Sequence, residues 1–236
     1  MRICITISYN GTTFLGSQIQ VDTNNTIFNQ IENVLNEINI YSKPQASGRT
    51  DKGVHATGQT FHIDIPKYWQ DLKKLKETLN RMLPKSIDIK KITKVQNDFH
   101  ARYGAKSRVY RYIIKKSKSN PFENDLVSFY ENVDFENIQK NIKLFEGKFD
   151  FINFMKTGSE VNSTKREVYK TIAYKYKDFI VLYFEANGFL RAQVRLMVGA
   201  LLSLSKTQIK EQLSSKKIHK IKPAKANGLY LVKIKY

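Results

Sequence analysis

Hydrophobic residues recur along this chain with two different periods, and each period predicts one kind of secondary structure. Apolar residues alternate with polar ones over residues 3–9, as in a strand with one buried face, and recur every three or four positions over residues 27–38, as in a helix. The same patterns predict strands at 3–9, 61–65, 87–95, 107–116, 167–176, 179–186 and 228–236. They predict helices at 27–38, 72–82, 135–145 and 190–201, the last continuing or followed by another through 213.

Residues with strong local preferences mark several boundaries of these elements. Thr26 stands where an N-cap is expected, Pro84 ends the second helix, and Gly147 occupies the usual glycine position after the third. The two residues 177–178 between two strand patterns suit a hairpin turn. Strands and helices alternate twice, which predicts an α+β fold of two βαββαβ halves that divide near residue 105, with the helices covering one face.

The composition fits a folded protein that binds a polyanion. Of the 236 residues, 41% are hydrophobic and 12% are aromatic, which exceeds what disordered chains contain. Forty Lys and Arg face 21 Asp and Glu, so the formal net charge is +19. Such a charge favours nucleic acid as the partner. An anionic membrane surface is the alternative, although no basic amphipathic helix stands out.

Cysteine content and apolar run lengths restrict the class of protein further. Cys4 is the single cysteine, which excludes an intrachain disulfide and a cysteine-based zinc site. The first residues alternate like a strand and do not form the apolar block of a signal peptide. Apolar runs stay well short of the ~20 residues that cross a bilayer. We therefore expect a soluble, cytoplasmic protein.

The stretch "ASGRTDKGVHATGQ" at residues 46–59 surrounds one carboxylate, Asp51, with glycines and cations. The positive charges of Arg49 and Lys52 favour the ionised form of an aspartate that lies between them. Asp51 is therefore a candidate nucleophile or general base. A surface turn in which Asp51 caps a backbone amide is the structural alternative. The glycine spacing matches no phosphate-binding loop, and a central aspartate would repel phosphate.

Five blocks of sequence resemble the TruA family of tRNA pseudouridine synthases. They are "YNGTTFLGSQIQ" at 9–20, "GRTDKGVHATGQ" at 48–59, "FHARYGAKSRVYRYII" at 99–114, "ANGFLRAQVRLMVGALL" at 186–202 and "NGLYLV" at 227–232. They occur in family order along the whole chain. The resemblance implies an isomerase that converts uridine to pseudouridine in the tRNA anticodon stem-loop, at positions 38, 39 and 40. It also implies a homodimer that uses no metal or organic cofactor.

The resemblance extends to fold and to individual residues. It implies one extended mixed sheet built from two ferredoxin-like halves, with residues 1–105 carrying the catalytic loop and residues 106–236 completing the active-site cleft. Asp51 matches the family's nucleophile, which attacks either C6 of the base or C1′ of the ribose. Arg49 matches the arginine that helps extrude the base, Tyr110 the tyrosine that stacks on it, and Arg195 the arginine that pairs with the aspartate. Leu229 would help to line the slot for the base.

Each of these residues also has a structural interpretation. Tyr110 would face the core like Tyr112, two positions further along the same strand. Arg49 would form a surface ion pair, and Leu229 would be a packing residue. His55 and His100 are too isolated for a metal site, so structural or RNA-contact roles are expected. Ser17 replaces the tryptophan that the family usually has after the first strand.

Two other functions compete with the active isomerase. A catalytically silent RNA-binding or RNA-chaperone protein of the same fold is one, and a pseudouridine synthase for other uridine positions is the second. Retention of Arg49, Asp51, Tyr110 and Arg195 together argues against the first. A zinc deaminase would need cysteine ligands that this chain lacks.

Overall fold

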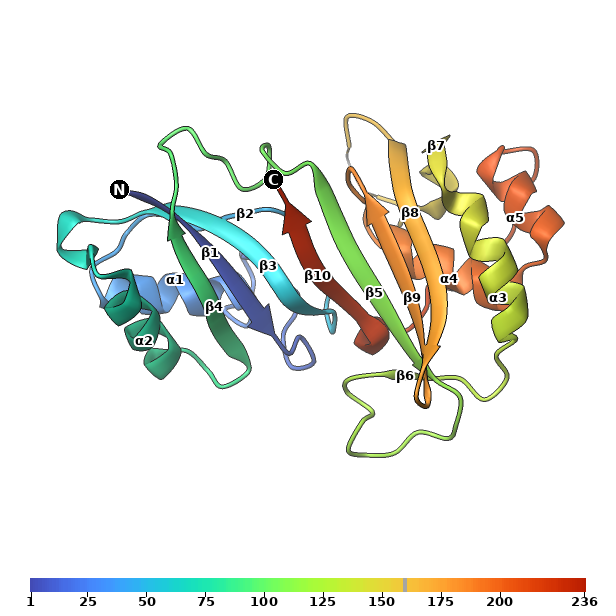
Figure 1. Cartoon of the computed structure of the whole chain (residues 1–236), viewed down its shortest axis with the longest axis horizontal. Coiled ribbons are helices and arrows are strands. Elements are labelled where there is room, and N and C mark those ends of the chain that lie inside the picture. The colour runs from blue at the N-terminus through green and yellow to red at the C-terminus, as the bar shows by residue number, and fades with distance from the viewer. Residues whose placement is uncertain (159–160) are drawn as a thin grey trace. The chain divides into compact units, whose positions relative to one another are not determined.

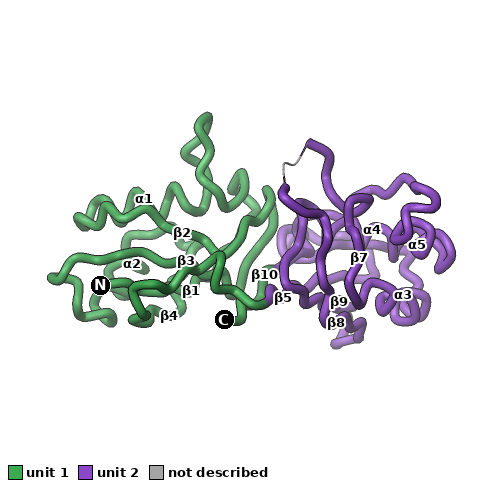
Figure 2. Tube along the Cα trace, turned by 90° about the horizontal axis from the view of Figure 1, so that it is seen from above, with its two compact units in different colours: residues 1–106, 231–236 green, residues 107–230 purple. Residues whose placement is uncertain are grey.

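The computed structural model describes residues 1–158 and 161–236, which form two compact units (Figure 2). Unit 1 contains residues 1–106 and 231–236, and unit 2 contains residues 107–230. The last strand, β10 (Leu229–Lys235), starts in unit 2 and ends in unit 1. Within the described residues, no helix combines the length and the apolar character that a membrane crossing requires.

Unit 1 is an antiparallel sheet with two helices (Figure 1). β1 lies between β3 and β4, β2 pairs with the outer part of β3, and the unit 1 part of β10 lies beside β3. The bounds of its elements are β1 (Arg2–Tyr9), α1 (Ile27–Glu37), β2 (Gln45–Ala46), β3 (His55–Asp64), a 3₁₀ turn (Lys67–Trp69), α2 (Leu72–Met82) and β4 (Ile87–Lys94).

Both helices of unit 1 cover the same face of its sheet. Phe28 of α1 packs edge to face on Phe61 of β3, with ring centroids 5.5 Å apart, and Phe61 lies opposite Ile5 of β1. On α2, the Asn80 amide accepts a hydrogen bond from the backbone N–H of Ile89, whose register partner is Ile7. The alternate residues of β1 are buried because this face is covered.

Unit 2 is a mixed sheet with three helices. β9 lies between β5 and β8, β7 pairs with the other edge of β8, and these pairs are antiparallel, whereas β6 pairs with β5 in parallel. The bounds are β5 (Ser107–Lys115), β6 (Ser128–Phe129), α3 (Phe135–Asn141), β7 (Gly147–Asp150), β8 (Lys165–Tyr176), β9 (Phe179–Ala186), α4 (Gln193–Ser203), α5 (Lys206–Leu213), and 3₁₀ turns at Ile142–Phe145, Ile152–Phe154 and Ala226–Gly228.

The predicted α+β class with a mixed sheet is confirmed, as are several boundaries. The Thr26 side chain caps α1 by accepting from the N–H of Asn29, and α2 ends at Met82, just before Pro84. Gly147 has the positive φ of 120° expected after a helix, and Tyr176 pairs with Phe179 across the two-residue hairpin. The expected assignment of the catalytic loop and the cleft to two ferredoxin-like halves stays a prediction.

Three expectations about the bounds of individual elements were wrong, and three short strands were missed. The strand expected at 61–65 is β3 (His55–Asp64), because polar residues such as Gln59 are buried in it and hide its alternation. The helix expected from residue 190 begins at Gln193, since Ala192 adopts a left-handed conformation with φ 59°. The helix at 135–145 tightens to 3₁₀ after Asn141. The short strands β2, β6 and β7 were not predicted.

Candidate active site

Asp51 lies in the loop of residues 47–54, between β2 and β3 of unit 1. The backbone N–H of Val54 donates to the carbonyl of Asp51 at 3.1 Å, which closes a tight turn through Gly53, whose φ is +76°. Thr50 is buried, whereas Arg49 is exposed and Asp51 is half-buried. The loop therefore turns the Thr50 side chain inward and leaves the cation of Arg49 and the carboxylate of Asp51 accessible on either side of it.

Thr50 is held by a buried chain of polar side chains. Its Oγ1 lies 2.7 Å from the Tyr9 hydroxyl, and its backbone N–H donates to Ser17 Oγ at 2.8 Å. The N–H of Ser17 in turn donates to the carbonyl of Thr50 at 3.0 Å. Burial raises the pKa of the Tyr9 phenol, so the hydroxyl stays protonated at neutral pH. The backbone N–H and the carbonyl of Thr50, one residue before Asp51, are therefore both held by hydrogen bonds to Ser17.

The first residues of the loop are held by Gln59 of β3, which is fully buried. Ser47 Oγ donates to Gln59 Oε1 at 2.7 Å, and Gln59 Nε2 donates to the carbonyl of Gly48 at 2.8 Å. The N–H of Ser47 donates to the carbonyl of Thr60 at 2.8 Å. Each buried bond of this kind contributes about 1 kcal/mol, and an orphaned partner costs more.

Glycines of the turn after β1 allow it to pack directly on the Asp51 loop. A Cβ at Gly11 would overlap the carbonyl oxygen of Val54, and one at Gly16, where φ is +112°, would lie 3.1 Å from the carbonyl oxygen of Thr50. Gly58, in the motif itself, faces the carbonyl of Val232 in β10 at a distance that excludes a side chain. Its role is therefore strand packing. Gly48 alone of these meets open space among the described residues.

Tyr110, Arg195 and Leu229 lie in unit 2. Tyr110 projects from β5 and is 9% exposed, and its ring packs edge to face on Phe189 with centroids 5.2 Å apart. Tyr112, on the same face, is fully buried and its hydroxyl donates to the carbonyl of Lys225 at 2.8 Å. Leu229 is 6% exposed at the start of β10. The burial of Tyr110 and Leu229 fits packing as well as a base-binding role.

Arg195 lies in the first turn of α4 and is half-buried. Its Nε donates to the carbonyl of Ala224 at 2.7 Å, and the N–H of Ala224 donates back to the carbonyl of Arg195 at 2.9 Å. Gly199, one turn further along α4, has the backbone of Lys222 against it so closely that a Cβ would overlap it. The segment 222–224 thus runs against α4 and orients the guanidinium of Arg195.

The predicted site residues therefore fall into two sets, with Arg49 and Asp51 on one loop of unit 1 and the other three in unit 2. Their catalytic roles, and the pairing of Arg195 with Asp51, stay predictions. The sequence interpretation did not identify the side chains that hold the loop, namely Tyr9, Ser17, Thr50 and Gln59. Ser17 carried a usable signal, because the family resemblance leads one to expect a tryptophan at its position.

The two histidines singled out from the sequence both accept backbone hydrogen bonds. His55 is buried and its Nδ1 accepts from the N–H of Gly11 at 3.1 Å, which supports a structural role. His100 Nδ1 accepts from the N–H groups of Arg102 and Tyr103. Across the described ranges, no three His, Cys, Asp or Glu side chains are grouped so that they could hold a metal ion.

These observations define a class, a strongly basic α+β protein with an aspartate on an anchored loop between two strands. A family model described as tRNA pseudouridine synthase matches residues 5–104 and 142–236. The tRNA pseudouridine synthase A of Campylobacter jejuni (strain RM1221) is 39% identical over the full length of both chains. The enzyme of the same name from Wolinella succinogenes is 37% identical over 98% of this chain and 92% of its own.

A more distant relative shows the same agreement. The tRNA pseudouridine synthase A of Lactococcus lactis subsp. cremoris (strain MG1363) is 36% identical over 100% of this chain and 97% of its own. Among solved structures, a chain of "Crystal Structure of a Cbf5-Nop10-Gar1 Complex" aligns with 12% identity over 85% of this chain and 45% of that one. The TM-score of that alignment is 0.38, which is too low for a structural likeness. The chain belongs to the tRNA pseudouridine synthase family, and so to the isomerases that act on uridine in tRNA. The family resemblance drawn from the sequence is confirmed.

Proposed function

We propose that this protein forms pseudouridine in the anticodon stem-loop of tRNA, at positions 38, 39 and 40, with Asp51 as the nucleophile. The observation on which this proposal rests is the anchored loop, which presents the half-buried Asp51 carboxylate next to Arg49. The net charge of +19 supports tRNA as the substrate, since counterion release from phosphates drives binding to a basic protein.

The reaction breaks the bond between C1′ and N1 of uridine and joins C1′ to C5. The proton on C5 leaves and N1 gains one, so the overall change is an isomerisation that consumes no other reactant. The base must first leave the helix, at a cost of a few kcal/mol. We propose that Arg49 helps to extrude it, that the Tyr110 ring stacks on it, and that Arg195 pairs with Asp51.

Anchoring of the loop suits this chemistry. A nucleophile adds most to the rate when it is held near its attack position before the substrate arrives, because the entropy cost is then already met by folding. The hydrogen bonds of Ser17, Tyr9 and Gln59 fix the backbone on the N-terminal side of Asp51, and the turn to Val54 fixes it on the other side. Attack at C6 of the base and attack at C1′ both need such a fixed carboxylate.

Positional mapping tests the proposed substrate. Unmodified tRNA transcripts with uridine at 38, 39 or 40 are incubated with the protein, and pseudouridine is located by sequencing. We expect a product at each of these positions and none when that uridine is replaced by cytidine. Product at uridines outside the anticodon stem-loop would identify the alternative synthase, and tRNA binding with no product at all would identify the silent RNA-binding protein.

The family resemblance also supports a homodimer that acts in the cytoplasm. Sedimentation equilibrium of the free protein tests the oligomeric state. A mass near twice the 27.4 kDa of the chain is expected, and a single-chain mass at micromolar concentration would contradict it.

A further inference from the structure

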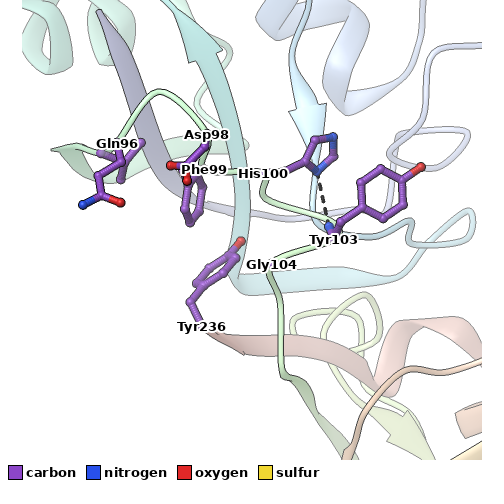
Figure 3. Close-up of a pocket in the computed structure, with 8 residues that line it drawn as sticks. Gln96, Asp98, Phe99, His100, Tyr103, Gly104 and Tyr236 are labelled. Carbon is purple, nitrogen blue, oxygen red and sulfur yellow. Dashed lines mark hydrogen bonds between the residues drawn. The ribbon is translucent and has the colours of Figure 1, made fainter.

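A second feature of unit 1 is a hollow of about 520 Å³ beside the connection from β4 to β5 (Figure 3). It lies on the sheet face opposite the two helices, since the connection packs on His62, whose neighbour Phe61 faces α1. Its lining residues are Val95, Gln96, Asp98, Phe99, His100, Tyr103, Gly104 and Tyr236.

The lining is dominated by aromatic rings that remain open to solvent. Tyr103 is 79% exposed and its ring lies over that of His100, with centroids 4.4 Å apart and planes tilted by 37°. Tyr236 is 39% exposed and its centroid lies 4.9 Å from that of Phe99. Single exposed aromatic rings are common on soluble proteins, whereas grouped ones form apolar patches that tend to mark binding sites.

The backbone segment that carries His100 and Tyr103 is held by hydrogen bonds. The N–H groups of Arg102 and Tyr103 both donate to His100 Nδ1, at 3.1 and 3.2 Å, as Figure 3 shows for the second. The N–H of Ala101 donates to His62 Nδ1 at 3.2 Å, and that of Gly104 donates to the carbonyl of His100 at 2.9 Å. A ligand that stacks here therefore meets a backbone that needs little further ordering.

The charges around the hollow favour a nucleotide. The Arg102 guanidinium lies 5.8 Å from the centroid of the Tyr103 ring, and further exposed cations flank the hollow in sequence at Lys94, Lys106 and Lys235. Asp98 and Gln96 belong to the lining itself. A carboxylate repels phosphate but accepts hydrogen bonds from the N–H groups of a base edge. The hollow thus suits a base, and the cations that neighbour its lining residues in sequence suit the phosphates on either side of that base.

We propose that the hollow binds an unpaired nucleobase of the tRNA substrate by stacking on Tyr103, at a point away from Asp51. The Asp51 loop leads into β3 at His55, and the connection that lines the hollow contacts β3 at His62, seven residues further along. At ~3.3 Å per residue, these two points of the strand are about 23 Å apart. The inference rests on the proposed function only in taking tRNA as the partner. Stacking on aromatic rings is the usual way in which proteins hold unpaired bases.

Substitution of Tyr103 tests this inference. With unmodified tRNA at one fixed salt concentration, Tyr103→Ala should raise the Kd about 10-fold, whereas Tyr103→Phe should stay within about 2-fold of the wild type. The increase should also appear in KM. Tyr41→Ala is the matched control, because Tyr41 is 72% exposed in the same unit and lies outside the hollow. Thermal unfolding checks that each variant is folded.

The salt dependence separates stacking from charge. Tyr103→Ala should lower the affinity without changing the slope of log K against log salt, since the ring neutralises no phosphate, whereas Arg102→Gln should reduce that slope by about 1. Photocrosslinking with tRNA that contains 4-thiouridine should attach RNA to the peptide of residues 96–104.

The inference would be overturned if Tyr103→Ala bound tRNA as tightly as the wild type, or if crosslinks formed elsewhere on the chain but not at residues 96–104. Either result would leave pseudouridine formation by the wild type intact. Conversely, absence of pseudouridine with retained Tyr103-dependent binding would refute the proposed function and leave this site standing.

Discussion

Two connections in unit 1 hold their functional side chains in opposite ways. The loop before β3 fixes its backbone with buried hydroxyl and amide groups and presents one half-buried carboxylate, Asp51. The connection after β4 uses imidazole acceptors on His62 and His100 and leaves aromatic rings exposed. The first arrangement suits a group whose position determines a rate, and the second suits a surface that contributes affinity. Changes to the first should therefore lower kcat, and changes to the second should raise KM.

The largest effect on stability is expected where two backbones touch. Gly11→Ala would drive a methyl group into the carbonyl of Val54, and neither backbone can move without disturbing the Asp51 loop. Overpacking of this kind costs about 3 kcal/mol, so the Tm should fall by about 6–12 °C. Differential scanning calorimetry measures this, and kcat should fall at temperatures where the variant is still folded.

Gly48→Ala is the matched control for that change, because its methyl group would meet open space in the described structure. Its Tm should stay within about 2 °C of the wild type. Equal loss of stability in the two glycine variants would contradict the close packing of the turn after β1 on the loop.

A smaller effect is expected from removing one anchor. Ser17→Ala leaves the buried N–H of Thr50 without its acceptor, which costs about 1–3 kcal/mol and loosens the residue before Asp51. We expect kcat to fall about 10-fold while KM for tRNA stays within about 2-fold, because displacement of a reacting group affects the chemical step most.

Ser214→Ala, at an exposed serine of unit 2, should leave both kinetic constants unchanged. If Ser17→Ala lowered the Tm but left kcat at the wild-type value, Ser17 would support the fold without positioning Asp51.

The smallest effect concerns pH and the connection after β4. Burial lowers the pKa of His62, and the nearby His100 and Arg2 lower it further, against the opposing charge of Asp64. As the pH falls, His62 therefore takes up a proton at a higher pH in the unfolded chain than in the folded one. The stability that neutral His62 provides is lost as the pH falls from about 6.5 toward the pKa of the folded state. Protonation also competes with the bond from Ala101 to Nδ1.

NMR titration of the imidazole protons checks the direction of this shift. The His62 signal should titrate below 6.5, and the Tm difference between wild type and His62→Gln should shrink on acidification from pH 7.5 to pH 5.5. A His62 pKa above 6.5 would contradict the proposed environment.

The elements with strong periodic patterns could be predicted from the sequence, and the polar scaffold of the site could not. Alternation at residues 3–9 and the cap at Thr26 depend on local chemistry that single positions reveal. Gln59 and Thr50 are buried together with hydrogen-bond partners such as Gly48 and Ser17, which lie 11 and 33 residues away in sequence. Until such partners are known, polar residues are expected at the surface. Periodicity therefore missed the first six residues of β3.

Asp51 could be proposed from the sequence because glycines and cations cluster around it and because the motif matches a family. Tyr103 could not, since an exposed ring has the same sequence pattern as a buried one. Its significance depends on the ring of His100 and on the hollow, which exist only after the connection has folded back on β3.

The most direct test of the account is the rate of pseudouridine formation by Asp51→Asn under single-turnover conditions with unmodified tRNA. Replacement of one carboxyl oxygen by an amide nitrogen removes the nucleophile and should reduce the rate by about 10⁴-fold. The Kd for tRNA should stay within about 3-fold, and Asp88→Asn, at an exposed site on β4, should behave as the wild type. Turnover by Asp51→Asn within about 10-fold of the wild type would show that the anchored carboxylate is not the reacting group.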